Sequence, residues 1–318
     1  MNLKQLEYFV KVAELGSFSK AALVLNIAQP ALSRQVRALE TDLHENLLLR
    51  TGRGVVLTEA GKRLFEHSVG ILQLVTRARE DIDQGRDAPV GRIVIGLPPS
   101  VGRALTLPLI DAFKRQLPRA KLAIVEGLTA HIAEWIATGR VDVGLVYNPD
   151  ASTAIETIPV REEALCLVGP AAQSPSATRG RRRAETNGAV PVRDLPAFPL
   201  IVPERTHAIR KLVETQAALA GIKLEVAFEV SSVQSILELV REGYGYAVLS
   251  ESALAASGQA EAFSRRPLTE PPLTTTLFVA VSAHKPSTPL VKHAMRLLKE
   301  LVAGVPGSRA PVQGRRTN

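Results

Sequence analysis

The sequence has 318 residues, 46% of them hydrophobic and 22% charged, which is the profile of a soluble globular protein of two or three domains. No apolar run approaches the roughly 20 residues that a membrane-spanning helix needs, so we expect no contact with a membrane. The net charge of +8 comes mostly from residues 171–190 and 304–318, with +3 each, whereas residues 1–86 carry only +2. The net charge therefore does not indicate a nucleic-acid site, and only the positions of individual residues can do so.

The first 45 residues carry the pattern of three short helices. The first, residues 3–15, has apolar residues at helical spacing and a glycine after it. Ser17 or Ser19 can cap the second, which has a face of small residues, and Asn26 can end it. Pro30 suits the first turn of the third, whose apolar stripe is Leu32, Val36, Leu39 and Leu43. Two short helices joined by a tight turn predict a helix-turn-helix.

The polar side of the third helix is formed by Gln29, Ser33, Arg34 and Arg37. Taken alone, these residues fit a solvated helix face as well as a surface that contacts a partner. In the next segment, two apolar triplets at 47–49 and 55–57 flank the glycine-containing stretch RTGRG, which is typical of a β-hairpin. We expect a two-stranded wing with Arg50 and Arg53 at its tip.

A long helix is predicted from Thr58 to about residue 84. Steps of four and three alternate along it, which is the spacing of a coiled-coil seam, at Leu64, Ser68, Ile71, Val75, Ala78 and Ile82. A helix lying on its own domain is the alternative. Because the preceding domain is small and already closed, we favour dimerisation through this seam.

From Gly91 onward, strand-like and helix-like segments alternate, which predicts a parallel sheet flanked by helices. The expected strands are 92–97, 121–127, 141–147, 164–168, 200–202, 224–230, 246–249 and 274–281. The expected helices are 104–117, 129–139, 207–220, 232–242 and 289–302. Residues 171–190 are polar and rich in Pro, Ser and Arg, so we expect them to be unstructured. The alternation of strands and helices falls into two runs along the chain, and these could form two similar lobes.

This layout resembles the LysR-type transcriptional regulators over roughly residues 1–303. The stretches LKQLEYFVKVAELGSFSKAALVLNIAQPALSRQVRALE and LLLRTGRGVVLTEAG carry the resemblance. Within the family, IAQPALSRQV, EALCLVG, VPERTHAIR and YAVLSESA look closest to the nitrogen-assimilation-control branch. One departure is Ala28, where many members have serine, because alanine is a poor helix cap. The third helix must then rely on the preset geometry of Pro30 or on another acceptor.

The resemblance implies an α/β protein with an N-terminal all-α winged helix-turn-helix. The implied divisions are a DNA-binding domain at 1–58, a linker and dimerisation helix at 59–87, a two-lobed effector-binding domain at 88–303 resembling periplasmic binding proteins, and a disordered tail at 304–318. It implies a double-stranded DNA operator, a small-molecule inducer, a dimer through the linker helix, a homotetramer through the effector domains, and contact with RNA polymerase.

The family pattern also assigns roles to the polar side of the third helix. It places Gln29, Pro30, Ser33 and Arg34 against base edges in the major groove, where arginine pairs with guanine and glutamine with adenine. Arg37, Arg50 and Arg53 would meet phosphates, which fix register without reading sequence.

In the second half of the chain, four residues would line the cleft between the lobes by family position: Ser100, Thr129, Thr206 and Ser231, with Pro203 shaping its wall. Pro98-Pro99-Ser100 follows a strand and opens a helix, and a helix N-terminus favours an anion. Each of the four hydroxyl residues also precedes or opens a predicted helix, so an ordinary cap is the competing interpretation. Both roles stay open here. An anionic metabolite is the expected inducer.

Enzyme and transport functions are less consistent with the sequence. It has no G-x-S-x-G elbow, no phosphate loop and no HxxxH pair, so we expect no catalysis, cofactor or metal. His131 and His207 fit structural roles, with ligand contact as the alternative. The single cysteine, Cys166, sits in an apolar run, which favours a buried thiol. Without a secretory signal pattern, and with a winged domain, a cytoplasmic regulator is favoured over a transport protein. The inducer, the operator and the direction of regulation stay undetermined.

Overall fold

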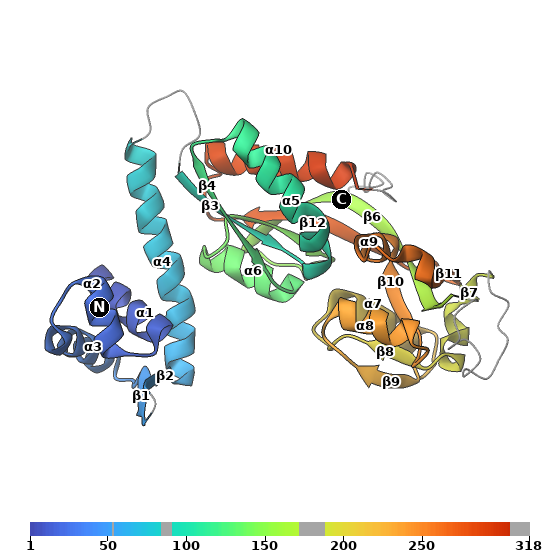
Figure 1. The fold of residues 1–318 in the computed structure, drawn as a ribbon, viewed down its shortest axis with the longest axis horizontal. Coiled ribbons are helices and arrows are strands. Elements are labelled where there is room, and N and C mark those ends of the chain that lie inside the picture. Colours follow the sequence, from blue (N-terminus) through green and yellow to red (C-terminus); the bar gives the residue numbers. More distant parts are fainter. Residues whose placement is uncertain (53, 84–90, 172–187, 306–318) are drawn as a thin grey trace.

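The computed structural model describes residues 1–52, 54–83, 91–171 and 188–305. Figure 1 shows a small, mostly helical N-terminal domain and a larger α/β C-terminal domain, with one long helix, α4, beside both. The end of the predicted linker, most of the predicted unstructured segment 171–190 and most of the predicted tail 304–318 lie outside the described residues. No helix among the described residues has the length and apolar character needed to cross a membrane.

The N-terminal domain confirms the predicted three helices and hairpin. Its elements are α1 (Leu3–Leu15), α2 (Phe18–Leu25), α3 (Gln29–Leu43), β1 (Leu48–Thr51) and β2 (Gly54–Leu57). Ser17 caps α2 by accepting the amide of Lys20, and Asn26 ends it in the left-handed conformation. Ala28 precedes α3 without a side-chain cap, and proline stands in the first turn. The buried stripe of α3 closes the domain core, as predicted: Leu32, Val36 and Leu39.

Helix α4 (Glu59–Asp83) begins at Thr58, whose hydroxyl accepts the amide of Gly61. Its first half packs on the N-terminal domain, because Leu64 joins the core formed by α1 and Ser68 is fully buried. The predicted single seam is therefore wrong for these two positions. Ile71 and Leu74 remain 36% and 47% exposed, and Ala78 is also exposed. The side chain of Ile82 lies outside the described residues.

The C-terminal domain is built on one long mixed sheet in the order β4-β3-β5-β12-β6-β11-β7, with β10 also paired to β6. The strands are β3 (Gly91–Leu97), β4 (Ala120–Glu126), β5 (Val143–Tyr147), β6 (Ile155–Pro170), β7 (Val190–Pro191), β10 (Ala247–Ser250), β11 (Phe263–Thr269) and β12 (Thr274–Ser282). Only β4-β3-β5 and β11-β7 pair in parallel within this described sheet, so the predicted parallel sheet is correct for part of the domain only.

Strand β6 connects the two lobes, because it pairs with strands of both. The sequence predicts only a short strand at 164–168, but β6 has 16 residues. Its first part pairs with β12 and its last part with β10 and β11. The polar stretch before residue 164 hides this continuity, because its exposed side chains lack the pattern of a buried strand. The first lobe comprises β3, β4, β5, β12 and the start of β6; the second comprises the end of β6 and the elements between it and β12.

Helices cover both faces of the first lobe, and alternate residues of β3 show why. Ile93 and Ile95 face α5 and α10, whereas Val94 faces α6. These helices are α5 (Pro99–Gln116), α6 (Thr129–Thr138) and α10 (Pro289–Ala303). The second lobe adds a parallel pair, β8 (Leu200–Val202) and β9 (Val226–Glu229), with α7 (Ala208–Leu219), α8 (Val233–Arg241), α9 (Glu251–Ala256), and the 3-10 turns η2 (Val192–Ala197) and η3 (Ala260–Ala262).

Candidate functional site

The polar side of α3 is the first candidate surface. Gln29, Pro30, Arg34 and Arg37 are exposed, on the side away from the buried stripe. Ser33 differs, because it is only 8% exposed and is engaged by neighbouring groups of the chain. The expectation that Ser33 presents a side chain beside Arg34 is therefore not met in the unbound protein. Crowding against the domain core explains this, since Ser33 follows the fully buried Leu32.

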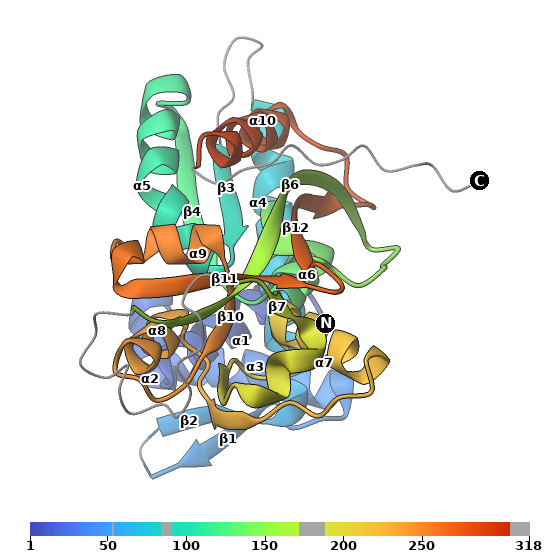
Figure 2. The same ribbon diagram turned by 90° about the vertical axis from the view of Figure 1, so that its right-hand side faces the viewer.

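The hairpin β1-β2 extends this surface. Its strands pair Arg50 with Val55 and Thr51 with Gly54, and Figure 2 shows it projecting from the N-terminal domain. Arg50 lies in β1, with its side chain outside the described part of the chain, and Arg53 lies outside the described residues altogether.

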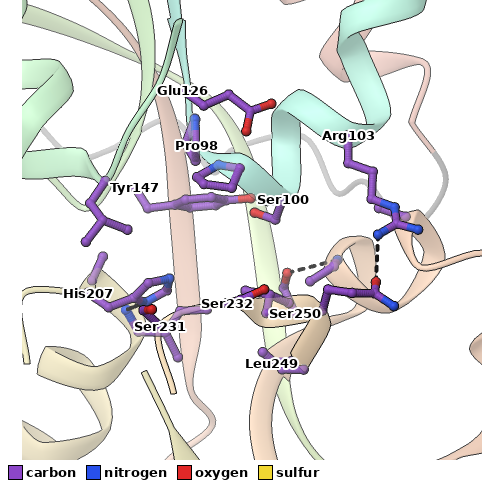
Figure 3. A pocket seen from close by; sticks show the side chains of 18 of the residues that line it. Pro98, Ser100, Arg103, Glu126, Tyr147, His207, Ser231, Ser232, Leu249 and Ser250 are labelled. Atoms are coloured by element: carbon purple, nitrogen blue, oxygen red, sulfur yellow. Dashed lines mark hydrogen bonds between the residues drawn. The ribbon is translucent and has the colours of Figure 1, made fainter. Parts of the chain in front are cut away.

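The second candidate site is a cavity of about 570 Å³ between the two lobes. Of the five residues predicted for it, Ser100, Thr129 and Ser231 line it. Figure 3 shows Ser100 and Ser231 in this position. The described residues that line it do not include Pro203 or Thr206. Pro203 is buried and its carbonyl accepts a hydrogen bond from Arg210, while Thr206 is exposed. His207, the next residue along, faces the cavity instead.

The helix caps near this cavity differ from the predicted ones by one residue. Helix α7 is capped by His207, whose Nδ1 accepts the amide of Ile209 at 3.2 Å. Helix α8 is capped by Ser232, which lies next to the predicted Ser231. No side-chain cap begins α5 or α6, both of which lie wholly within the described residues. The competing interpretation, that Ser100, Thr129, Thr206 and Ser231 are helix caps, is therefore wrong for all four.

Thr129 is instead bonded to the backbone at the end of β5. Its hydroxyl accepts the amide of Tyr147 at 3.0 Å and donates to the carbonyl of the same residue at 3.3 Å. A hydroxyl has one donor and two acceptor positions, so Thr129 keeps only one acceptor position for a ligand.

Tyr147 forms part of the cavity wall, and the side chains of Ser100 and Ser252 lie near its hydroxyl. Burial, and then the nearby carboxylate of Glu163, raise the pKa of Tyr147 above its ordinary value, so this group remains a protonated donor. Behind it, Arg161 and Glu163 form an ion pair with a 2.9 Å Nε–Oε1 distance, each side chain 3% exposed. Ser252 donates to the other oxygen of Glu163 at 2.6 Å.

Two polar contacts join the lobes, and the residues of the first one line the cavity. Arg103 of α5 donates from Nη1 to Oε1 of Gln234 in α8 at 2.6 Å, a contact drawn in Figure 3. Lys211 of α7 lies 3.2 Å from a carboxylate oxygen of Asp150. Because these pairs hold elements of different lobes, they must adjust whenever the lobes move relative to each other.

The sequence did not single out Arg103, Glu126, Tyr147 or Gln234 as cavity residues. For Glu126 and Tyr147 a signal was present, since they lie at the carboxyl ends of the predicted strands 121–127 and 141–147, and ligands bind beyond such ends in parallel sheets. Arg103 and Gln234 meet only through the packing of separate lobes.

The remaining candidate groups, Cys166, His131 and His207, all have partners within the chain. Cys166 is buried, its thiol lies 3.4 Å from the Leu249 carbonyl, and burial raises its pKa to about 12. His131 is exposed and stacks on Trp135 at 6.0 Å between ring centroids. Burial lowers the pKa of His207, with Glu204 opposing the shift. Within the described residues, no three His, Cys, Asp or Glu side chains are grouped as metal ligands would be.

Family models match both parts of the chain. Residues 3–62 match the "Bacterial regulatory helix-turn-helix protein, lysR family", and residues 86–303 match the "LysR substrate binding domain". The nitrogen assimilation regulatory protein nac of Klebsiella aerogenes is 30% identical, over 95% of this chain and 96% of its own length. The nac protein of Escherichia coli K12 is equally similar, with the same identity and coverage.

Solved structures resemble the whole chain. A full-length OxyR variant from Pseudomonas aeruginosa has a TM-score of 0.70 at 24% identity and covers 99% of both chains. Full-length BenM has a TM-score of 0.56 at 27% identity and covers 98% of this chain and 99% of its own. The order of the domains and the two-lobed fold are thus shared with structures that contain both parts.

Proposed function

Because this chain belongs to the LysR family of DNA-binding transcriptional regulators, we propose that α3 reads its operator and that an anionic metabolite between the lobes controls it. The observation that carries the first part is the exposed N-terminal end of α3. Gln29, Pro30 and Arg34 share that end, and recognition helices contact bases with their N-terminal residues.

The proposed roles divide between base edges and phosphates. Arg34 pairs with guanine acceptors, Gln29 with adenine, and Pro30 contacts a thymine methyl. Arg37, Arg50 and Arg53 bind phosphates. Ser33 joins the base-reading set only if its side chain turns outward on binding, because it is buried in the free protein.

Gel-shift titrations test these roles with a duplex selected from a random library on the wild-type protein. Arg34→Ala should weaken specific binding by about 1–3 kcal/mol for each base that Arg34 reads, with little change on unrelated DNA. Arg37→Ala is the matched control, because it should weaken all sequences about equally and reduce the salt dependence. Equal losses on both kinds of DNA for Arg34→Ala would reject its assignment as a base reader.

The effector proposal rests on the cavity lining. Arg103 adds a positive charge to the cavity lining, and Ser100 and Ser231 add hydroxyls from opposite lobes. Leucine and proline side chains form the apolar part of the lining. Glu126 also lies on the lining, so an anion must bind on the side of Arg103. We expect a small carboxylate whose uncharged body fills the apolar part of the cavity.

A thermal-shift screen of the full chain against small carboxylates and amino acids tests this site. Compounds that stabilise the wild-type protein should shift Ser100→Ala and Ser231→Ala less. Thr206→Ala is the control, since Thr206 is exposed and outside the lining. A compound that shifts all four proteins equally binds elsewhere.

The proposal extends to assembly, partners and location. The exposed part of α4, with Ile71, Leu74 and Ala78, supports a dimer through this helix, and a tetramer would add contacts between effector domains. Ile71→Asp with Leu74→Asp should lower the mass measured by light scattering, because buried charge is costly unless paired.

Contact with RNA polymerase, a cytoplasmic location and the lack of enzymatic activity are further parts of the proposal. They are supported by the relatives, which are named as regulators.

A further inference from the structure

Gly70 lies in the interior of the long helix α4, where glycine is unfavourable to helix formation. A Cβ atom at this position would lie 2.1 Å from the carbonyl oxygen of Thr138, at the end of α6. That oxygen belongs to the backbone, so it cannot move aside as the end of a flexible side chain could. The linker helix therefore crosses the end of α6 at a distance that only glycine permits.

Gln73, one turn further along α4, adds hydrogen bonds to the same contact. With its amide nitrogen turned toward α6, the side chain donates to the carbonyl oxygens of Gly139 and Arg140, each at 3.0 Å. Gly139 is the C-cap of α6 and Arg140 follows it, so neither carbonyl has a partner within the helix. Glu66, one turn before Gly70, lies 3.7 Å from Nη1 of Arg140. One side of α4 thus caps the C-terminal turn of α6.

The other end of α6 reaches the inter-lobe cavity. Thr129, its first residue, lines the cavity and holds the backbone of Tyr147 through two hydrogen bonds. Between the two ends, Ile132 and Ile136 are fully buried against the sheet, so α6 is held to the first lobe and connects the cavity to the linker helix. The helix has 10 residues, so it spans about 15 Å from the cavity to the linker helix.

We propose that the docking of α4 on the end of α6 carries the state of the inter-lobe cavity to the DNA-binding domain. A cavity of about 230 Å³, lined from α1, α4 and β3 and including Gln73, borders this contact. The coupling role rests on the proposed function, because it requires a ligand in one domain and DNA on the other. The docking contact itself does not.

The chain contains its own probe of this contact. Trp135, the only tryptophan in the sequence, lies on α6. The guanidinium of Arg140 sits 4.6 Å from the centre of its ring, and the same guanidinium faces Glu66 of α4. Separation of α4 from α6 therefore changes the surroundings of the tryptophan directly.

Tryptophan fluorescence of the full chain tests the docking. Gly70→Ala inserts a methyl group where no space exists, yet alanine favours the helix itself. Gln73→Glu keeps the shape of the side chain but replaces its donor with a carboxylate that faces carbonyl oxygens. Both variants should increase quenching by acrylamide and shift the emission maximum to longer wavelength. His67→Glu, which adds a charge at an exposed position of α4, should behave like the wild type. Folded variants with wild-type quenching would overturn the proposal.

Hydrogen exchange tests the coupling, with saturating selected duplex as the probe. Because coupling between sites is reciprocal, DNA should alter exchange in residues 97–101 and 128–133, beside the cavity, in the wild type and in His67→Glu. In Gly70→Ala this effect should disappear while the bound duplex is retained. An equal effect in Gly70→Ala would overturn the coupling. If no duplex can be selected, the DNA-contact proposal fails, and the fluorescence result still decides the docking.

Discussion

The exposed face of α3 and the inter-lobe cavity are built in opposite ways. The α3 face comes from a single helix, with its polar side chains in solvent and its opposite stripe buried. The cavity draws on elements of both lobes, and its polar groups already bond to one another, as Arg103 does with Gln234. A ligand must exchange these internal bonds for its own. A ligand can shift an equilibrium between two arrangements of the lobes only when this exchange gives it different affinities for the two.

The largest contrast between the two regions should come from the same substitution made in each. Arg161→Ala leaves the buried carboxylate of Glu163 without its ion-pair partner, which should cost about 3–5 kcal/mol in the free energy of unfolding. Arg37→Ala removes an exposed side chain and should change it by less than about 0.5 kcal/mol. Urea denaturation followed by circular dichroism measures both.

A double variant separates burial of charge from loss of packing. Replacing the pair by Arg161→Met and Glu163→Leu removes both charges together, and such replacements are often neutral or stabilising. The double variant should therefore be more stable than Arg161→Ala alone. Equal losses for Arg161→Ala and Arg37→Ala would mean that water reaches the ion pair.

The same contrast explains what could be predicted from the sequence. The buried stripe of α3 and the hairpin depend on periodicity and turn residues within about 60 positions, and both were predicted correctly. The ion pair between Arg161 and Glu163, and the contact between Arg103 and Gln234, depend on how distant segments pack. No local pattern marks a polar residue as buried or as facing another lobe.

Intermediate cases show where local reasoning stops. Ser100, Thr129 and Ser231 were placed correctly at the cavity, but as helix caps they were wrong, because hydroxyl residues are frequent near helix starts and the start itself is uncertain by a residue. Thr206 illustrates the cost of this uncertainty, since the next residue, His207, takes both the cap and the place in the cavity wall. Strand β6 was predicted too short because four consecutive residues near its start are exposed.

A smaller effect is expected at the end of α6. Thr129→Val keeps the shape of the side chain but removes the hydroxyl that bonds both backbone groups of Tyr147, so it should cost about 1–2 kcal/mol of unfolding free energy. Thr129→Ser retains the hydroxyl and should lose less. The melting temperature and Trp135 fluorescence of the full chain measure the two variants side by side. A valine variant as stable as the serine variant would show that water replaces the hydroxyl.

The smallest effect concerns pH and His207. Burial lowers the pKa of this residue from its ordinary value of 6.5, and its Nδ1 can accept the Ile209 amide only while unprotonated. Below pH 6.5 the unfolded chain therefore binds a proton that the folded chain does not bind, so the free energy of unfolding decreases as the pH is lowered in that range. Above pH 6.5 the contribution is fully present. Chemical denaturation at pH values between about 5 and 8 should show this slope.

His207→Asn is the matched control for this slope. Asparagine is a favourable N-cap, so the variant should keep α7 capped at every pH, but it carries no group that titrates in this range. The difference in unfolding free energy between wild type and His207→Asn should be constant above pH 6.5 and move in favour of the variant as the pH falls. A difference that does not change with pH would place His207 in solvent, away from the cavity wall, because a solvated imidazole would have its ordinary pKa in both the folded and the unfolded chain.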